Sequence, residues 1–129
     1  MGGFIKVDAD RVETTALNTK VNKEVFNNFK IYCKELGYPL NVVLETFMQQ
    51  YANGRFEMDS EDILKWKGDT SEVDTLNTTF NKEIYVNFKY ACKGNRYFVK
   101  HVVTAFMEKY ASRKYIMEYV DVSKIKEDN

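Results

Sequence analysis

Small or polar side chains, five of which can hydrogen-bond to DNA bases, stand at every second position in two short stretches of the chain. They are Ala16, Asn18 and Lys20 in the first stretch, and Thr75, Asn77 and Thr79 in the second. Asn can pair with adenine through two bonds, Lys can donate to guanine O6 or N7, and Thr can contact a base edge or the thymine methyl group. A single face presenting these residues together could read the sequence of double-stranded DNA.

The two stretches belong to an internal duplication. The segment that begins at Leu17 returns at Leu76, an offset of 76 − 17 = 59 residues, and the offset holds without a gap. Over positions 17–52, 17 of 36 residues are identical to their counterparts, far more than chance gives. Asn and Thr are also ordinary on a solvated strand, but the return of Asn at the equivalent position favours the DNA interpretation. A duplication at fixed spacing indicates two units that share one core.

Strict alternation of apolar and polar residues predicts a half-buried strand at the start of each unit. In the first unit this strand covers 15–21, with Leu17 and Val21 on the inner side, and Leu76 and Phe80 take those places in the second. A lone strand of this length is not stable. The two strands are therefore expected to pair with each other in antiparallel orientation.

Two helices are expected after each strand. Asn22 and Asn81 are suited to cap the first helix of each unit, and apolar residues then recur every three or four positions. Gly37 is expected to end the helix in the first unit, and Gly94-Asn95 its counterpart. The second helix is expected to begin near Pro39, because Pro is preorganised for the first helical position.

The sequence divides into five segments. They are a lead-in at 1–14, a first repeat at 15–55, an acidic linker with a short helix at 56–73, a second repeat at 74–113 and a C-terminal tail at 114–129. Asp59-Ser60 is expected to cap the linker helix. The tail resembles the linker, since Met58 and Met117 also lie 59 residues apart.

Charge is balanced overall but unevenly distributed. The chain has 19 basic and 19 acidic residues. Residues 15–55 carry 5 basic and 3 acidic groups (+2), residues 74–115 carry 8 and 3 (+5), and the remainder carries 6 and 13 (−7). A globally neutral chain can therefore present a basic face to a polyanion.

Several other classes of protein are not expected. No nucleophile–base set, paired carboxylates or glycine-rich phosphate loop stands out, so we expect no enzyme, catalytic residue, cofactor or small-molecule substrate. One His and no Cys-x-x-Cys argue against a metal site. We expect Cys33 and Cys92 to be buried, unpaired residues on helices. The alternative, a disulfide between them, would need close Cα atoms and an oxidising compartment. Without a long apolar run or a signal-peptide core, we expect a cytoplasmic protein with no membrane partner.

The order strand, helix, helix resembles the ribbon-helix-helix family of DNA-binding proteins, which includes the methionine and Arc repressors. The resemblance covers residues 15–53 and 74–112, and two copies in one chain resemble the tandem, TraY-type proteins of DNA-transfer systems. It implies a mainly α fold with a short antiparallel β-ribbon, in which two ribbon-helix-helix repeats form an intramolecular pseudo-dimer. It also implies that the six alternating residues named first contact bases in the major groove.

In that family the N-terminus of the second helix holds a DNA phosphate, commonly with a Ser-x-Ser-like start. This chain departs from the pattern, with Pro39-Leu40-Asn41 and Phe98-Val99-Lys100. Pro39 has no N–H, which predicts a weaker first phosphate contact, and charge is expected to compensate in the second unit. Carried over by position, the phosphate-contacting candidates are Asn41, Arg96, Lys100 and His101. His101 also fits an ordinary surface histidine.

The expected function is sequence-specific binding of double-stranded DNA, with a transcriptional repressor as the first hypothesis. An accessory protein of plasmid transfer or segregation shares the same chemistry, and either could involve self-association of chains on DNA. A protein-interaction module that has kept the fold and lost DNA is a third hypothesis. Zero net charge and the missing Ser-x-Ser favour it, whereas the basic repeats and paired Asn residues oppose it.

Overall fold

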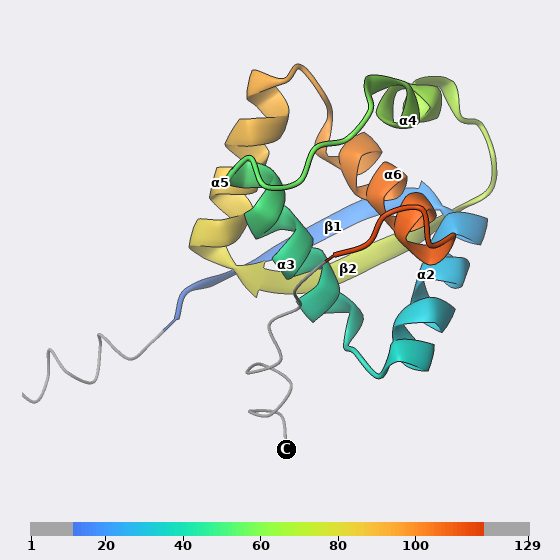
Figure 1. Ribbon diagram of the computed structural model, residues 1–129, viewed down its shortest axis with the longest axis horizontal. Helices are drawn as coiled ribbons and strands as arrows, with labels where there is room; N and C mark the ends of the chain where they lie inside the picture. Colours follow the sequence, from blue (N-terminus) through green and yellow to red (C-terminus); the bar gives the residue numbers. More distant parts are fainter. Residues whose placement is uncertain (1–11, 118–129) are drawn as a thin grey trace, which may run out of the picture.

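The computed structural model describes residues 12–117 (Figure 1). Its elements in chain order are β1 (Thr14–Asn22), α2 (Lys23–Leu36), α3 (Leu40–Ala52), α4 (Ser60–Leu64), the 3-10 helix η1 (Lys65–Gly68), β2 (Val73–Asn81), α5 (Lys82–Gly94) and α6 (Val99–Ala111). Most of the lead-in and of the tail lies outside these residues. The predicted similarity of the tail to the linker therefore falls, beyond Met117, outside the described residues. No helix within 12–117 is long and apolar enough to cross a membrane.

The two strands pair with each other in antiparallel orientation, as the alternation predicts. The register runs from Thr14 opposite Asn81 to Asn22 opposite Val73. Beyond each end, a helix residue extends the ladder: Lys23 N donates to Glu72 O and Lys82 N donates to Glu13 O, both at 2.9 Å. The predicted inward residues Leu17, Val21, Leu76 and Phe80 are all buried.

The fold class expected from the sequence is wrong, because it counts two ribbon-helix-helix repeats. The described residues contain one two-stranded sheet, and therefore one ribbon. The physical reason is hydrogen bonding: each half supplies a single strand, and its ladder partner is the strand of the other half. The linker also adds the helix α4, so the chain has five α-helices within 12–117.

The helices pack across the two halves of the chain. Figure 1 shows α3 beside α5, and α2 beside α6, all on one side of the ribbon. At the centre, Phe47 and Phe106 stack with ring centroids 4.0 Å apart and planes 11° from parallel. One apolar cluster thus takes in residues of both strands and of all four long helices, so neither half has a core of its own.

Cys33 and Cys92 are both buried in this core as free thiols. Burial raises the pKa of each thiol to about 12. The thiolate is the reactive form, so both cysteines are poor nucleophiles at neutral pH.

The helix ends follow the sequence in part. Asn22 and Asn81 cap α2 and α5, as predicted, by accepting from Val25 N at 2.9 Å and Ile84 N at 3.1 Å. Gly37 ends α2 with a left-handed φ of 80°. Helix α5 ends at Gly94 with Asn95 as its C-cap, as predicted. Its ending differs from that of α2, because Asn95 has a φ of −87° and the left-handed residue is Arg96, with φ 65°.

The linker folds back on the second half. Ile63 of α4 is buried, and Asp62 accepts a hydrogen bond of 2.8 Å from the hydroxyl of Tyr115. Lys65 of η1 pairs with Glu108 of α6 at 2.8 Å. The short helix begins at Ser60 as predicted, although the side chain of Asp59 makes no capping hydrogen bond. These contacts hold the linker against α6, and Lys67 of η1 shares a cavity with Lys100 at the start of that helix.

Candidate nucleic-acid interface

The outer face of the ribbon carries all six residues expected to contact bases. They form three cross-strand pairs, Ala16 with Thr79, Asn18 with Asn77, and Lys20 with Thr75. All six are exposed, because successive side chains of a strand point to opposite faces and the alternate residues fill the core. This face therefore presents two amides, three smaller side chains and one cation, with no acidic residue among the six.

The ribbon face differs at its two ends. The central pair, Asn18 and Asn77, joins two residues that are 59 positions apart, so the duplicated positions meet each other. On one side of this pair lies Lys20 with Thr75, and on the other side lies Ala16 with Thr79. The only positive charge among the six residues is thus at one end.

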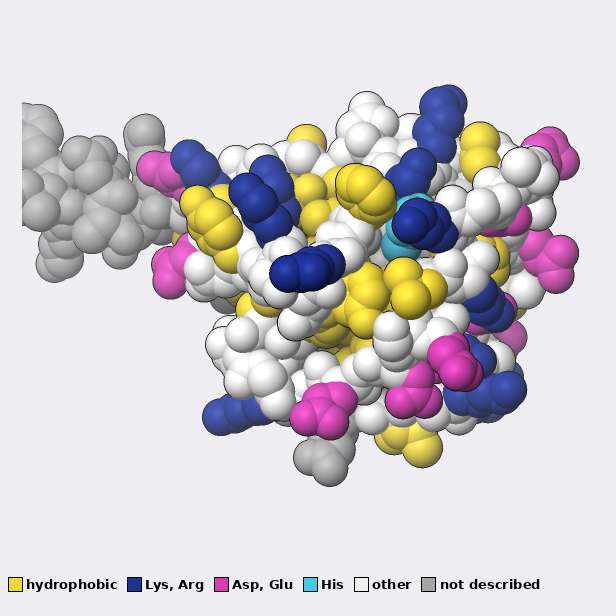
Figure 2. Space-filling model, turned by 90° about the horizontal axis from the view of Figure 1, so that it is seen from above, with side chains coloured by type: hydrophobic (Ala, Val, Ile, Leu, Met, Phe, Trp, Pro, Cys, Tyr) yellow, Lys and Arg dark blue, Asp and Glu magenta, His cyan; other side chains and the backbone are white. Residues whose placement is uncertain are grey.

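Four basic side chains gather at that charged end. We call Lys20, Lys67, Lys100 and His101 the α6 cluster, because they line one shallow cavity of about 100 Å³ at the start of α6. They come from β1, η1 and α6. No ion pair within residues 12–117 engages any of the three lysines. In Figure 2 the histidine lies among dark blue side chains on this side of the molecule.

One carboxylate shares the cavity of the α6 cluster. Asp69 accepts hydrogen bonds from the hydroxyl of Ser71 at 2.7 Å and from the side-chain amide of Asn22 at 3.1 Å. These bonds lower the pKa of Asp69, which therefore stays ionised and offsets part of the positive charge. The cluster keeps a net positive charge, since three lysines face one carboxylate.

The pKa of His101 is lowered by its surroundings. Its side chain is partly buried and packs edge-to-face with Phe98 at 5.5 Å between ring centroids. Burial lowers the pKa of His101, and the charges of Lys100 and Lys67 lower it further. The imidazole is therefore neutral at pH 7 in the free protein, so the lysines supply the positive charge there.

The N-termini of α3 and α6 have similar backbones but different charge. Pro39 and Phe98 precede them with extended φ and ψ of −60°, 137° and −78°, 141°, and neither helix has a side-chain cap. The expectation that Pro39 weakens the first site is not supported by this geometry, because Pro39 precedes the first helical residue and Leu40 and Asn41 keep their N–H groups. The difference lies in Asn41, which is neutral and stands 59 positions before Lys100.

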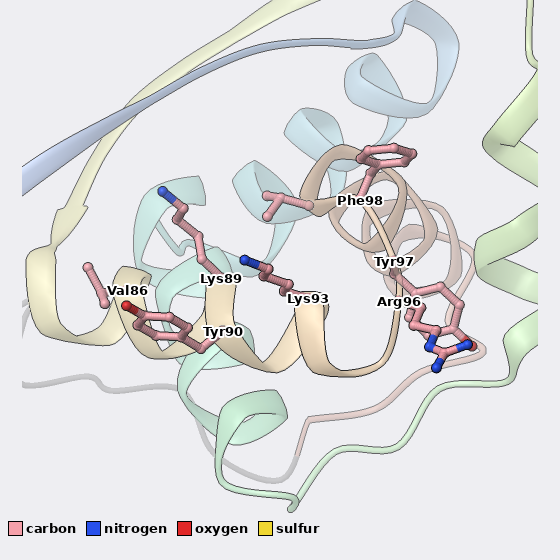
Figure 3. A pocket seen from close by; sticks show the side chains of 8 residues that line it. Val86, Lys89, Tyr90, Lys93, Arg96, Tyr97 and Phe98 are labelled. Atoms are coloured by element: carbon pink, nitrogen blue, oxygen red, sulfur yellow. The ribbon is translucent and has the colours of Figure 1, made fainter.

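The predicted phosphate-contacting residues are only partly brought together. Lys100 and His101 share the α6 cluster, whereas Asn41 is exposed at the start of the other helix. Arg96 lines a separate, larger pocket with Lys89 and Lys93 (Figure 3). Sequence reasoning did not identify Lys67, because the fold of the linker brings it to α6 and no local pattern marks that contact.

No group of three or more metal-ligating side chains occurs in the part of the chain that the structure describes. Comparisons with protein-family models, with curated proteins and with solved structures find no match. The ribbon-helix-helix resemblance therefore depends on the order of elements and on the residues of the ribbon alone.

Proposed function

We propose that this chain binds double-stranded DNA by placing the ribbon of β1 and β2 in the major groove. The observation that carries the proposal is the outer face of the ribbon, where Asn18 and Asn77 lie side by side in a row of exposed residues without acidic side chains. The major groove is about 12 Å wide and admits a two-stranded ribbon. Each Asn can pair with an adenine through two hydrogen bonds, which supplies sequence preference.

The α6 cluster supports the same proposal. It adjoins the charged end of the ribbon, where a DNA backbone would run along the edge of the groove. Lys67 and Lys100 have no ion-pair partner within residues 12–117, so a phosphate would be their counter-ion. The amides of the first turn of α6 and the helix dipole favour an anion at the same place. Phosphate contacts supply most of the affinity for DNA, and base contacts supply the preference for one DNA sequence over another.

The proposed biological role is a transcriptional repressor that occupies an operator. The same DNA chemistry would serve an accessory protein of plasmid transfer or segregation. The genomic position of the preferred site distinguishes these roles, because an operator overlaps a promoter and an accessory site lies at a transfer origin or centromere.

The test is selection of bound duplexes from a random pool at about 100 mM salt, where non-specific binding is weakened. We expect one enriched motif for the wild-type chain and a relaxed motif for the double variant Asn18→Ala/Asn77→Ala. Retention of random duplexes without enrichment would overturn base reading, and so would the same motif from both proteins. Failure to retain any duplex would favour the protein-interaction module.

A further inference from the structure

A second basic surface lies between α5 and the start of α6, outside the ribbon face and the α6 cluster. It is an open pocket of about 650 Å³, which we call the α5–α6 pocket. The lining residues that matter here are Val86, Lys89, Tyr90, Lys93, Arg96 and Phe98. Figure 3 shows Tyr90 at one end of the pocket, Phe98 at the other, and both lysine side chains rising from α5.

Two aromatic rings at this pocket are exposed to water. Tyr90 is 70% exposed and Phe98 is 67% exposed, although most large apolar side chains of this chain are in the core. Tyr97 and the aliphatic side chains of Val86 and Val99 also line the pocket. Exposed aromatic residues around an apolar hollow are typical of surfaces that bind a partner.

The charge of the pocket is uncompensated. Lys89, Lys93 and Arg96 line it, and no acidic residue does. None of the three takes part in an ion pair among the described residues, whereas Lys109 of the neighbouring helix pairs with Asp62. Arg96 also holds a left-handed φ of 65°, a conformation that favours glycine, so a guanidinium is kept here at a cost in stability.

The first half of the chain shows that the fold does not need these side chains. The counterparts of Val86, Tyr90, Arg96 and Phe98, 59 positions earlier, are Asn27, Ile31, Gly37 and Pro39. Lys30 and Lys34 are the counterparts of the two lysines and are present in both halves. The two exposed aromatic rings and the arginine are therefore special to the second half.

We propose that the α5–α6 pocket docks an acidic segment of a partner protein. A Phe or Leu side chain of that segment inserts between Tyr90 and Phe98, and its carboxylates face the two lysines and Arg96. Charge complementarity favours this occupant, because the pocket has three cations and no anion. The open shape favours a peptide over a small molecule, which would leave much of its surface in water.

The lining favours an acidic peptide over a single strand of nucleic acid. Single-strand binding depends on ring faces that are free to stack on bases. One contact of the Phe98 ring is already made, with His101, and two of the lining side chains, Val86 and Val99, are aliphatic. A lining that combines aliphatic and aromatic side chains suits the insertion of an apolar side chain. The inference stands independently of the proposed DNA binding.

The test is selection from a library of random peptides displayed on phage against the full chain. We expect enriched sequences that combine Asp or Glu with Phe or Leu. A synthetic peptide of the enriched sequence should lose about tenfold or more in affinity with Lys89→Glu/Lys93→Glu and with Tyr90→Ile/Phe98→Ala, since both alter the centre of the contact.

The matched control is Lys30→Glu/Lys34→Glu, the same change of charge at the counterpart positions on α2. We expect peptide affinity to stay within about twofold of the wild type, because long-range charge effects are screened over about 10 Å at 0.1 M salt. No enriched peptide, enrichment of sequences without acidic residues, or equal losses in control and pocket variants would each overturn the proposal. Binding of single-stranded oligothymidine that the pocket variants abolish, without peptide binding, would assign the pocket to nucleic acid instead.

Discussion

Asn18 and Asn77 occupy the same position of a duplicated sequence and lie directly opposite each other at the centre of the ribbon. Phe47 and Phe106, which are also 59 residues apart, stack on each other in the core. The exposed centre of the ribbon and the buried centre of the helices are thus each made by one pair of equivalent residues. The two halves differ at other positions, such as the ends of the ribbon and the start of α6.

The first prediction concerns base reading. Asn18→Ala and Asn77→Ala should each weaken binding to the selected duplex by about 1–3 kcal/mol, because each removes a two-bond contact with a base. Binding to random duplexes should change little. Titrations of fluorescent duplexes measure both quantities. Asn28→Ala, at an exposed asparagine of α2, is the control. Equal losses on selected and random DNA would remove the base-reading assignment.

A second prediction concerns phosphate contacts. Lys67→Ala and Lys100→Ala should weaken all duplexes alike and reduce the slope of log affinity against log salt by about one unit each. The converse change, Asn41→Lys, adds the charge that the first half lacks and should steepen the slope. Affinity measured across a range of salt concentrations tests all three variants. An unchanged slope in Lys67→Ala would mean that η1 does not approach the DNA backbone.

The third prediction is a dependence on pH. Burial, Lys100 and Lys67 hold the pKa of His101 below its usual value in the free protein. A phosphate at the α6 cluster, which Lys20 and Asp69 also face, would favour the charged imidazole. Binding then takes up a proton, so affinity should rise as pH falls from about 7 to 5. His101→Gln should flatten this rise at constant ionic strength, and an equal rise in the variant would exclude His101 as its source.

A fourth prediction concerns stability. Arg96 and Arg113 both have φ 65°, at the positions where Gly37 and Gly54 stand in the first half. Arg96→Gly should raise the free energy of unfolding by about 1 kcal/mol, because glycine adopts this conformation without steric cost.

Arg113→Gly should gain less than Arg96→Gly. Its guanidinium lies 3.5 Å from the carboxylate of Glu35 and 4.5 Å from the ring centre of Tyr32, and glycine would lose both contacts. Urea unfolding of the two variants beside the wild type gives the comparison. A loss of stability in Arg96→Gly would show that the arginine side chain contributes more than its backbone costs.

How far the sequence predicts this structure depends on the range of the interactions. The faces of the strands and the caps at Asn22 and Asn81 are local, so alternation and residue type were enough to predict them. The left-handed conformation of Arg96 was not predicted, because Gly and Asn adopt this conformation more readily and Gly94-Asn95 comes first in the sequence. Arg96 adopts it because the backbone of the second half repeats that of the first, where Gly37 stands at the equivalent position.

The rest of the site depends on tertiary contacts. Lys67 reaches the α6 cluster because Asp62 and Lys65 attach the linker to the second half. The count of two ribbon-helix-helix repeats was wrong for a related reason: each half supplies only one strand, so the two halves together make a single ribbon. The α5–α6 pocket was not predicted, because no local pattern indicates that Tyr90 and Phe98, which are eight residues apart, line one cavity.

The fifth prediction is that the chain binds its site in one orientation. The ribbon is charged only at the Lys20 end, so the selected motif should be asymmetric. A cleavage reagent on Val73→Cys, opposite Asn22 at that end, should cut on one side of the motif, and on Thr14→Cys it should cut on the other. The buried cysteines should not interfere, since burial raises the pKa of both thiols to about 12. Equal cuts on both sides from either position would contradict a fixed orientation.

Because one polypeptide supplies both strands, the ribbon forms without an encounter between two molecules. A DNA-binding ribbon assembled from two identical chains comes apart on dilution. When monomers prevail, the occupancy of a site by such a dimer rises with the square of protein concentration. For the DNA binding proposed above, occupancy of a site by one chain would rise in simple proportion to protein concentration, down to the lowest copy numbers in a cell. Mutations in one strand would also leave the other unchanged, so the two halves of a recognition site are free to diverge independently.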